Sequence, residues 1–377
     1  MLAPSVFLAT LDRLAIRFFV GVPDSLLKNF CAHAMETLPT ERHMIVANEG
    51  SAIGVAIGHY LSTGTPTLVY MQNSGFGNAV NPLISLADHE IYGVPMLLLV
   101  GWRGQPGVKD EPQHVKQGRV MTAMLEAMEV PWSVMPKNVD RMEQALQSAV
   151  ATSVERRCPY VLLVEKDTFA SENAGGLFSR DDADQRPSRE AALRALLPLL
   201  GESTFQVSTT GMLSRELFES RPPDSKDADR DFLTVGGMGH CSAIALGLAL
   251  HRREQEVWCL DGDGALLMHM GFMANIARSA PSNLFHVVFN NGVHDSVGGQ
   301  PTAIDAIDLV ALARAAGYSD GKRVTDLAEL ADGVTELRAS GGPALLEIVV
   351  RPGNRPDIGR PTMTPQEAKD RFMAGLR

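Results

Sequence analysis

Two short polar motifs, each at the end of an apolar segment, could together hold a divalent metal ion. Asp261-Gly262-Asp263-Gly264 follows an apolar segment directly, and Asn290-Asn291-Gly292 follows the next one. About 25 residues separate the motifs, which is room for one strand–helix–strand crossover, so Asp263 and Asn291 can lie at neighbouring strand ends. A carboxylate, an amide oxygen and a nearby backbone carbonyl form an oxygen ligand set that suits Mg²⁺.

The glycines of the first motif suit a bulky anion. Gly262 and Gly264 lack a Cβ, so a diphosphate could approach the backbone closely, and a helix starting after Gly264 would add a positive dipole end. The alternative is two unrelated turns, since each motif alone is common at strand ends. Their shared position after strands, one crossover apart, favours a common site.

Apolar segments of strand length alternate with helical patterns along the whole chain. Continuous apolar strands between helices are typical of parallel sheets covered on both faces. The expected strands are residues 18–20, 44–46, 67–70, 96–100 and 161–164, then 205–207, 232–235, 257–260, 286–289 and 344–350. The sequence thus predicts two doubly wound α/β domains with parallel sheets, residues 1–178 and 179–377, with no third central domain. Ser188 is the expected N-cap of a helix through Leu200.

Composition narrows the class of protein. The 377 residues carry a net charge of −10 with no basic run, which argues against nucleic acid and anionic membranes as partners. We find no apolar stretch of about 18 residues for a membrane span and no basic segment typical of a signal peptide. Four scattered cysteines (Cys31, Cys158, Cys241 and Cys259) indicate buried thiols in a reducing compartment, so we expect a cytoplasmic protein.

At these motifs the chain resembles the thiamine-diphosphate-dependent enzymes. The resemblance implies that Asp263, Asn291 and the Val293 carbonyl bind Mg²⁺ on the cofactor's diphosphate. Gly262, Gly264, Ala265 and Asn290 would line the diphosphate site. In the segment 235–240, the Gly236 carbonyl would hold the aminopyrimidine, and Met238 would bend the cofactor.

The resemblance also implies a catalytic glutamate on the other domain. Glu49, in the segment 44–52, stands after an expected strand among apolar residues, glycine and alanine. Alone it could be an ordinary exposed carboxylate at a helix start. In the family it would share a proton with the pyrimidine ring, a role that needs a raised pKa, which burial without a cationic partner would supply.

A closer resemblance, through nearly the whole chain, is to the phosphonopyruvate decarboxylase family. It is carried by residues 21–28, 73–78, 101–104, 110–114, 214–219 and 290–302. It implies decarboxylation of the 2-oxo acid phosphonopyruvate to phosphonoacetaldehyde and CO₂, in phosphonate metabolism or natural-product biosynthesis. It also implies a homodimer or larger assembly with active sites at the subunit interface, one chain's Glu49 serving another's Asp263.

Candidate substrate and proton-transfer residues are less sharply defined. Asp24 and Ser25 are expected at a helix start, where Ser25 could bind an anion or simply cap the helix. Asn73 and Arg103 are further substrate candidates, although a surface cation is the default interpretation of Arg103. His114 and His294 are the candidate acid–base histidines.

Three alternatives remain open. A sulfopyruvate decarboxylase is a close rival, but its two domains are commonly separate chains, so the fused chain favours the phosphonate. A non-catalytic diphosphate-binding subunit would have no use for Glu49. An NAD-dependent dehydrogenase is disfavoured because the motif from Gly75 carries Val80 in place of its third glycine.

Overall fold

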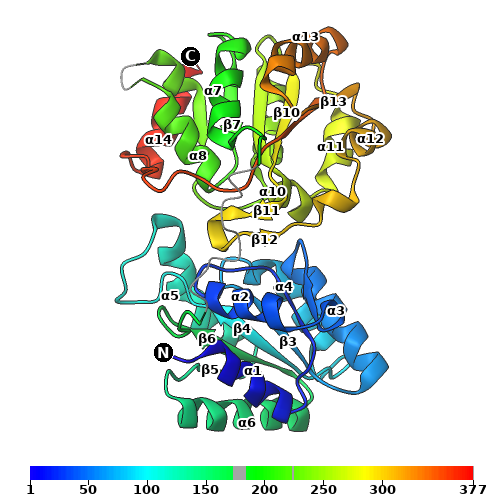
Figure 1. The fold of residues 1–377 in the computed structure, drawn as a ribbon, viewed down its shortest axis with the longest axis vertical. Helices are drawn as coiled ribbons and strands as arrows, with labels where there is room; N and C mark the ends of the chain where they lie inside the picture. Colours follow the sequence, from blue (N-terminus) through cyan, green and yellow to red (C-terminus); the bar gives the residue numbers. More distant parts are fainter. Residues whose placement is uncertain (173–183, 223–224, 377) are drawn as a thin grey trace. The chain divides into compact units, whose positions relative to one another are not determined.

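The computed structural model describes residues 1–172, 184–222 and 225–376. The chain divides into two compact units, residues 1–179 and 180–377. The predicted domain boundary between residues 178 and 179 lies outside the described residues. Figure 1 shows the order of the elements within each unit.

The first unit is a parallel sheet of six strands in the order β2-β1-β3-β4-β6-β5. Its strands are β1 (Phe19–Gly21), β2 (His43–Ile45), β3 (Thr67–Gln72), β4 (Met96–Gly101), β5 (Trp132–Val134) and β6 (Pro159–Val164). Its helices are α1 (Pro4–Arg13), α2 (Lys28–Thr37), α3 (Glu49–Thr63), α4 (Phe76–Pro82), α5 (Pro112–Ala127) and α6 (Val139–Arg156).

Alternation along the central strands builds one apolar core on each face of this sheet. Leu97 and Leu99 pack with α1, α2 and α6, whereas Leu98 and Val100 pack with α3, α4 and α5. Both faces are therefore covered, which explains the continuous apolar strands in the sequence.

The second unit repeats this architecture in the order β13-β14-β10-β9-β7-β8, again all parallel. Its strands are β7 (Phe205–Ser208), β8 (Asp231–Leu233), β9 (Val257–Gly262), β10 (Leu284–Asn290), β13 (Asp320–Val324) and β14 (Ala344–Val349), with a separate antiparallel pair β11 (Val293–His294) and β12 (Gln300–Pro301). Its helices are α7 (Arg189–Leu200), α8 (Met212–Ser220), α9 (Cys241–His251), α10 (Asp263–Met268), α11 (Phe272–Ser279), α12 (Leu309–Ala316), α13 (Leu330–Ser340) and α14 (Pro365–Gly375).

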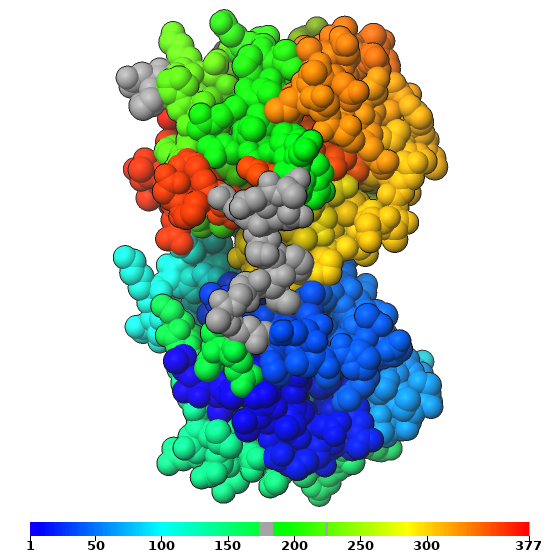
Figure 2. Space-filling model, viewed as in Figure 1, coloured from blue at the N-terminus to red at the C-terminus, as the bar shows by residue number. Residues whose placement is uncertain are grey.

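Two cores again flank the sheet. Helices α7, α8 and α13 cover one face, and α9, α11, α12 and α14 cover the other. Phe372 of α14 packs edge-on against Phe205 and Phe232, which fixes this C-terminal helix beside the sheet edge, and Figure 2 shows it in red at the surface of its unit.

The predicted fold class is confirmed, and so is each expected strand to within a few residues. Ser188 caps α7 as expected, since its side chain accepts a hydrogen bond from the amide of Ala191. The short edge strand β5 and the polar strand β13 were not predicted, because Trp132–Val134 is too short and Asp320–Val324 too charged to give an apolar signal. All four cysteines are buried and free. Within the described residues, no helix is both long and apolar enough to cross a bilayer.

Candidate active site

Glu49 is the first residue of α3 and is almost fully buried. Asn48 caps the helix by accepting a hydrogen bond from the amide of Gly50, and this cap fixes where α3 begins. The Glu49 carboxylate accepts one hydrogen bond from Asn78 Nδ2 at 2.8 Å, and we find no cationic partner for it among the described residues. Burial raises the pKa of Glu49 above its usual value, although the Asn78 hydrogen bond offsets part of this effect.

Gly75 makes room for the Glu49 side chain. A Cβ at Gly75 would lie 1.9 Å from Glu49 Oε1, so no larger residue fits without moving the carboxylate. The glycine that the sequence assigned to a broken dinucleotide motif is therefore explained by the buried acid beside it.

A second buried carboxylate lies in the first unit, at the carboxyl end of β1. Asp24 is fully buried and accepts hydrogen bonds from Gln72 Nε2 at 2.5 Å and from the Leu26 amide at 3.0 Å. Burial raises the pKa of Asp24, and these hydrogen bonds and the nearby Arg103 partly counter it. Gly101 is close to this group, since a Cβ there would lie 1.9 Å from Asp24 Oδ2.

Arg103 follows β4 and is fully engaged by protein groups. Its guanidinium pairs with both oxygens of Asp110, and its third nitrogen donates to Ser25 Oγ at 2.8 Å. Asp110 also accepts hydrogen bonds from the Gly104 amide at 2.8 Å and the Glu111 amide at 2.7 Å. These contacts hold the pKa of Asp110 well below its usual range, so the Arg103–Asp110 pair stays ionised and its net charge is close to zero.

Asn73 and His114 complete this polar cluster. Asn73 is buried and exchanges two hydrogen bonds with the backbone of Arg103, at 2.8 and 3.1 Å, which locks the end of β3 to that of β4. His114, on α5, has a buried Nδ1 without a hydrogen-bond partner. Burial, and then the Arg103 charge, lower its pKa, so the ring is neutral at pH 7. The structure thus brings Asp24, Ser25, Asn73 and Arg103 together.

One sequence expectation about this cluster is wrong. Asp24 and Ser25 do not begin a helix, because α2 starts at Lys28 and no side chain caps it. Asp24 instead accepts the Leu26 amide with its side chain and the Leu27 amide with its carbonyl, at 3.1 Å, and these bonds form a turn. Ser25 is thereby free to bond Arg103.

In the second unit, Asp263 is the first residue of α10, directly after β9. The sequence suggested a helix start after Gly264, but the helix begins at Asp263. The buried Asp263 carboxylate accepts a hydrogen bond from Thr302 Oγ1 at 2.5 Å. Burial raises the pKa of Asp263 to about 6 despite this bond and the nearby amides. Among the described residues no cation pairs with it, so the site lacks a positive charge that a divalent ion would provide.

The Asn291 side chain, a predicted metal ligand, is held in one orientation by Asp295. The Asn291 amide nitrogen donates to Asp295 Oδ2 at 2.7 Å, and its oxygen accepts from the Val293 amide at 3.1 Å. Arg189 donates to the same Asp295 oxygen at 3.0 Å and also pairs with the buried Glu216. This series of hydrogen bonds fixes which end of the Asn291 amide group carries the oxygen. Such supporting contacts are usual around metal ligands.

His294 packs onto the Asp263 loop as a neutral ring. A Cβ at Gly264 would lie 2.9 Å from its Cε1, so that glycine is required by the histidine. A Cβ at Gly262 meets nothing within 4 Å, which leaves open space beside the backbone there. Burial lowers the pKa of His294 to about 4, with Asp295 opposing the shift.

The remaining predicted cofactor residues have different surroundings. Ala265 is buried in α10, and the Asn290 side chain is engaged by Glu347 at 2.7 Å. The loop of Gly236 and Met238 precedes α9, and His240 Nδ1 contacts the carbonyls of Gly237 and Met238 at 3.1 and 3.2 Å.

Several supporting residues were missed by sequence reasoning. Thr302 and Asp295 hold Asp263 and Asn291, and Asp261 accepts the Gly262 amide at 2.8 Å and contacts His286 Nε2 at 3.3 Å. Asp261 and His286 alternate with apolar residues in strands, where a buried polar side chain gives no periodic signal. Thr302 and Asp295 follow the second motif closely, and that proximity was the available clue.

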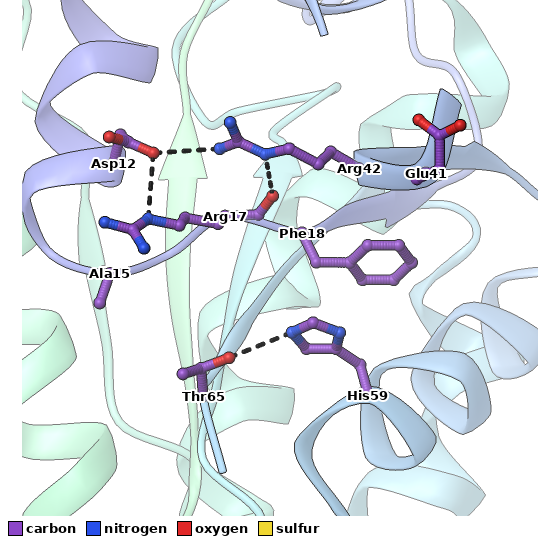
Figure 3. A pocket seen from close by; sticks show the side chains of 8 residues that line it. All are labelled: Asp12, Ala15, Arg17, Phe18, Glu41, Arg42, His59 and Thr65. Carbon is purple, nitrogen blue, oxygen red and sulfur yellow. Dashed lines mark hydrogen bonds and ion pairs between the residues drawn. The ribbon is translucent and has the colours of Figure 1, made fainter. Parts of the chain in front are cut away.

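A cavity of about 580 Å³ in the first unit lies away from these groups, at the amino ends of the strands. Arg17 and Arg42 line it, and both are paired with Asp12 at 3.2 and 3.1 Å, while Phe18 stacks on His59 (Figure 3). Ligands of open parallel sheets bind at the opposite, carboxyl edge, so this cavity is not the candidate site.

Comparison with known proteins finds a family match in each of the two units. The family described as "Thiamine pyrophosphate enzyme, N-terminal TPP binding domain" matches residues 1–126, and "Thiamine pyrophosphate enzyme, C-terminal TPP binding domain" matches residues 210–348. Thiamine pyrophosphate is the same compound as thiamine diphosphate. A phosphonopyruvate decarboxylase of Streptomyces viridochromogenes is 37% identical over 99% of this chain and 95% of its own. The chain belongs to the thiamine pyrophosphate enzyme family.

Two further relatives have the names of two different decarboxylases. A phosphonopyruvate decarboxylase of Streptomyces hygroscopicus is 36% identical over 99% of this chain and 93% of its own. A sulfopyruvate decarboxylase of Methanosarcina acetivorans is 29% identical over 94% of this chain and 92% of its own. That relative spans both units, so a fused chain alone does not separate the two activities as the sequence argument supposed.

The pKa of Asp263 predicts how the cofactor-free protein responds to pH. Folding raises this pKa from about 3.8 to about 6. The contribution of Asp263 to the free energy of unfolding is therefore fully present below pH 4 and is lost as pH rises through 6. Asp263→Asn removes that loss, so its free energy of unfolding relative to wild type should rise by up to about 3 kcal/mol between pH 4 and pH 7. Urea unfolding across this range measures the difference.

Two controls sharpen this experiment. Asp332→Asn alters an exposed carboxylate of α13 and should leave the pH profile unchanged. Added Mg²⁺ should raise the stability of wild type but not of Asp263→Asn. Parallel profiles for wild type and Asp263→Asn would contradict the assignment of a strained, uncompensated carboxylate.

Proposed function

We propose that this protein is a phosphonopyruvate decarboxylase that requires thiamine diphosphate and Mg²⁺. It would convert phosphonopyruvate to phosphonoacetaldehyde and CO₂. The observation that carries the proposal is the 37% identity to a phosphonopyruvate decarboxylase over 99% of the chain. The buried carboxylates Glu49 and Asp263, each just after a parallel strand, support it.

The residues of the second unit fit the diphosphate end of the cofactor. Asp263, Asn291 and the Val293 carbonyl would hold Mg²⁺, and the ion would compensate the buried Asp263 carboxylate. The open space at Gly262 would admit the diphosphate, with Gly264, Ala265 and Asn290 nearby. The Gly236 carbonyl and Met238 would hold the pyrimidine end.

In the first unit, Glu49 would hold the proton that activates the cofactor. Burial raises the pKa of the Glu49 carboxyl group, which favours sharing a proton with a ring nitrogen. The bound cofactor supplies the electron sink for the charge left when CO₂ departs. Asn78, which donates to Glu49 Oε2, would leave Oε1 available to the pyrimidine ring.

The polar cluster at the ends of β1, β3 and β4 would bind the substrate. Asp24, Ser25, Asn73 and Arg103 are held in one hydrogen-bonded network, which reduces the cost of ordering them on binding. His114 would orient the substrate or supply the last proton. Its neutral ring could first accept a proton and then transfer it. His294 is the other candidate, and its pKa of about 4 means that its ring is neutral at pH 7 and carries no additional proton to donate.

We further propose a homodimer or larger assembly with active sites between subunits. Helix α3, which begins with Glu49, leaves Gly54, Gly58 and Leu61 exposed, and Leu61 is 73% exposed. Helix α9 of the second unit likewise exposes Ile244 and Gly247. Exposed apolar helix faces of this kind are typical of protein–protein interfaces.

Glu49→Gln should separate binding from chemistry. The amide preserves the shape of the side chain but cannot share the proton, so turnover should fall by about 10² or more while thiamine diphosphate still binds. Steady-state kinetics and a cofactor-binding titration measure the two effects. Glu126→Gln, an exposed position on α5, serves as the control, and near-normal turnover of Glu49→Gln would remove Glu49 from the mechanism.

A substrate panel tests the proposed reaction itself. The protein with thiamine diphosphate and Mg²⁺ should release CO₂ from phosphonopyruvate with a kcat/KM at least about tenfold above that for sulfopyruvate or pyruvate. Preference for sulfopyruvate would favour the second candidate, which the Methanosarcina relative supports. No turnover of any 2-oxo acid would favour a non-catalytic diphosphate-binding subunit.

A further inference from the structure

A cavity of about 440 Å³ in the second unit is lined by two histidines that no part of the proposed mechanism uses. Its walls come from the start of α9, the end of α10 and the start of α11, and consist of Gly239, His240, Ala243, His269, Gly271, Phe272 and Asn275. The lining residues include no carboxylate, and the histidines are its titratable groups. The cavity therefore suits an anion better than a cation.

His240 has a defined tautomer. Its Nδ1 lies 3.1 Å from the Gly237 carbonyl and 3.2 Å from the Met238 carbonyl. Carbonyl oxygens only accept hydrogen bonds, so Nδ1 carries a proton and Nε2 is left to bind another group. The ring is exposed and rests on the loop that would hold the pyrimidine end of the cofactor.

His269 supplies a second, unsatisfied nitrogen. The two imidazole centroids lie 4.5 Å apart, and His269 Nε2 is buried without a hydrogen-bond partner. Gly239 is required for this arrangement, because a Cβ there would lie 2.6 Å from His269 Cδ2. Burial and then the neighbouring His240 lower the pKa of His269, so the pair is short of an anion.

We propose that His240 and His269 form the subsite for the phosphonate group of the substrate. This inference rests on the proposed function and adds to it the residues that select the anion. The two rings would contact separate phosphonate oxygens, with His240 Nε2 sharing a proton with one of them. The start of α9, with His240 at its N-cap and Ala243 in its first turn, adds the positive end of a helix dipole. Arg103 cannot serve this purpose without releasing Asp110 and Ser25.

The subsite would also discriminate against a sulfonate. A phosphoryl-type group carries a charge of about −1.5 to −2 near pH 7 and can share a proton with an imidazole. A sulfonate carries a single charge and is a much weaker proton acceptor. A histidine nitrogen that shares a proton with the bound anion therefore favours the phosphonate.

The test compares phosphonoacetate and sulfoacetate as inhibitors of the holoenzyme. In wild type, phosphonoacetate should bind more tightly. His240→Gln should narrow the ratio of the two inhibition constants by about 10-fold or more and raise the KM for phosphonopyruvate by a similar factor, with kcat changed far less. His269→Asn should act in the same direction.

Matched controls separate a subsite from a structural effect. His251→Gln, an exposed histidine at the other end of α9, should leave the ratio unchanged. If His240→Gln weakened the binding of both inhibitors equally, the effect would be a general distortion of the cofactor loop and the proposal would be overturned. An unchanged ratio of the two inhibition constants in His240→Gln would overturn it as well. His240 is exposed, so its substitution should not affect folding, which thermal unfolding checks. If wild type turns over phosphonopyruvate and the ratio is unchanged, the subsite fails and the proposed function stands.

Discussion

The burial of two carboxylates, for which the described part of the chain offers no positive partner, is the constraint on which the rest of the site depends. Glu49 and Asp263 each lie at the first residue of a helix that follows a parallel strand, and each is enclosed by protein. A buried ionised carboxylate is unfavourable unless a cation or several hydrogen bonds compensate it. In both groups burial raises the pKa, and under the proposed function Glu49 would share a proton with the cofactor while Asp263 would bind a divalent ion.

The residues around Glu49 and Asp263 make room for the two carboxylates and hold them in place. Gly75 gives Glu49 its space, and Asn78 leaves it a single side-chain donor, so its pKa stays raised. Around Asp263 the supporting groups are stronger: Thr302 donates to it directly, and Asp295 orients Asn291. Arg189 pairs with both Asp295 and the buried Glu216, so the loop after β10 is anchored to α7 and α8.

The fold could be predicted from sequence, whereas the contacts around the candidate site could not. Apolar strands predicted both sheets, and the spacing of the Asp263 and Asn291 motifs placed them correctly at the ends of neighbouring strands. The pairing of Arg103 with Asp110 depends on how the loop after β4 folds back, which no periodicity encodes. The Asp24 turn was misjudged as a helix start because Asp and Ser favour both structures. His240 and His269 were missed because they lie 29 positions apart in the sequence, and only the contact of the loop before α9 with the end of α10 brings them together.

The central claim is that Glu49 and Asp263 act on one cofactor and come from different chains. Mixing Glu49→Gln with Asp263→Ala protein under conditions that exchange subunits tests it most directly. Each mixed dimer would regain one intact site, so the activity should recover to about a quarter of wild type although both parents are nearly inactive. Subunit exchange without any recovery would contradict the account, because it would mean that the two carboxylates do not meet across subunits.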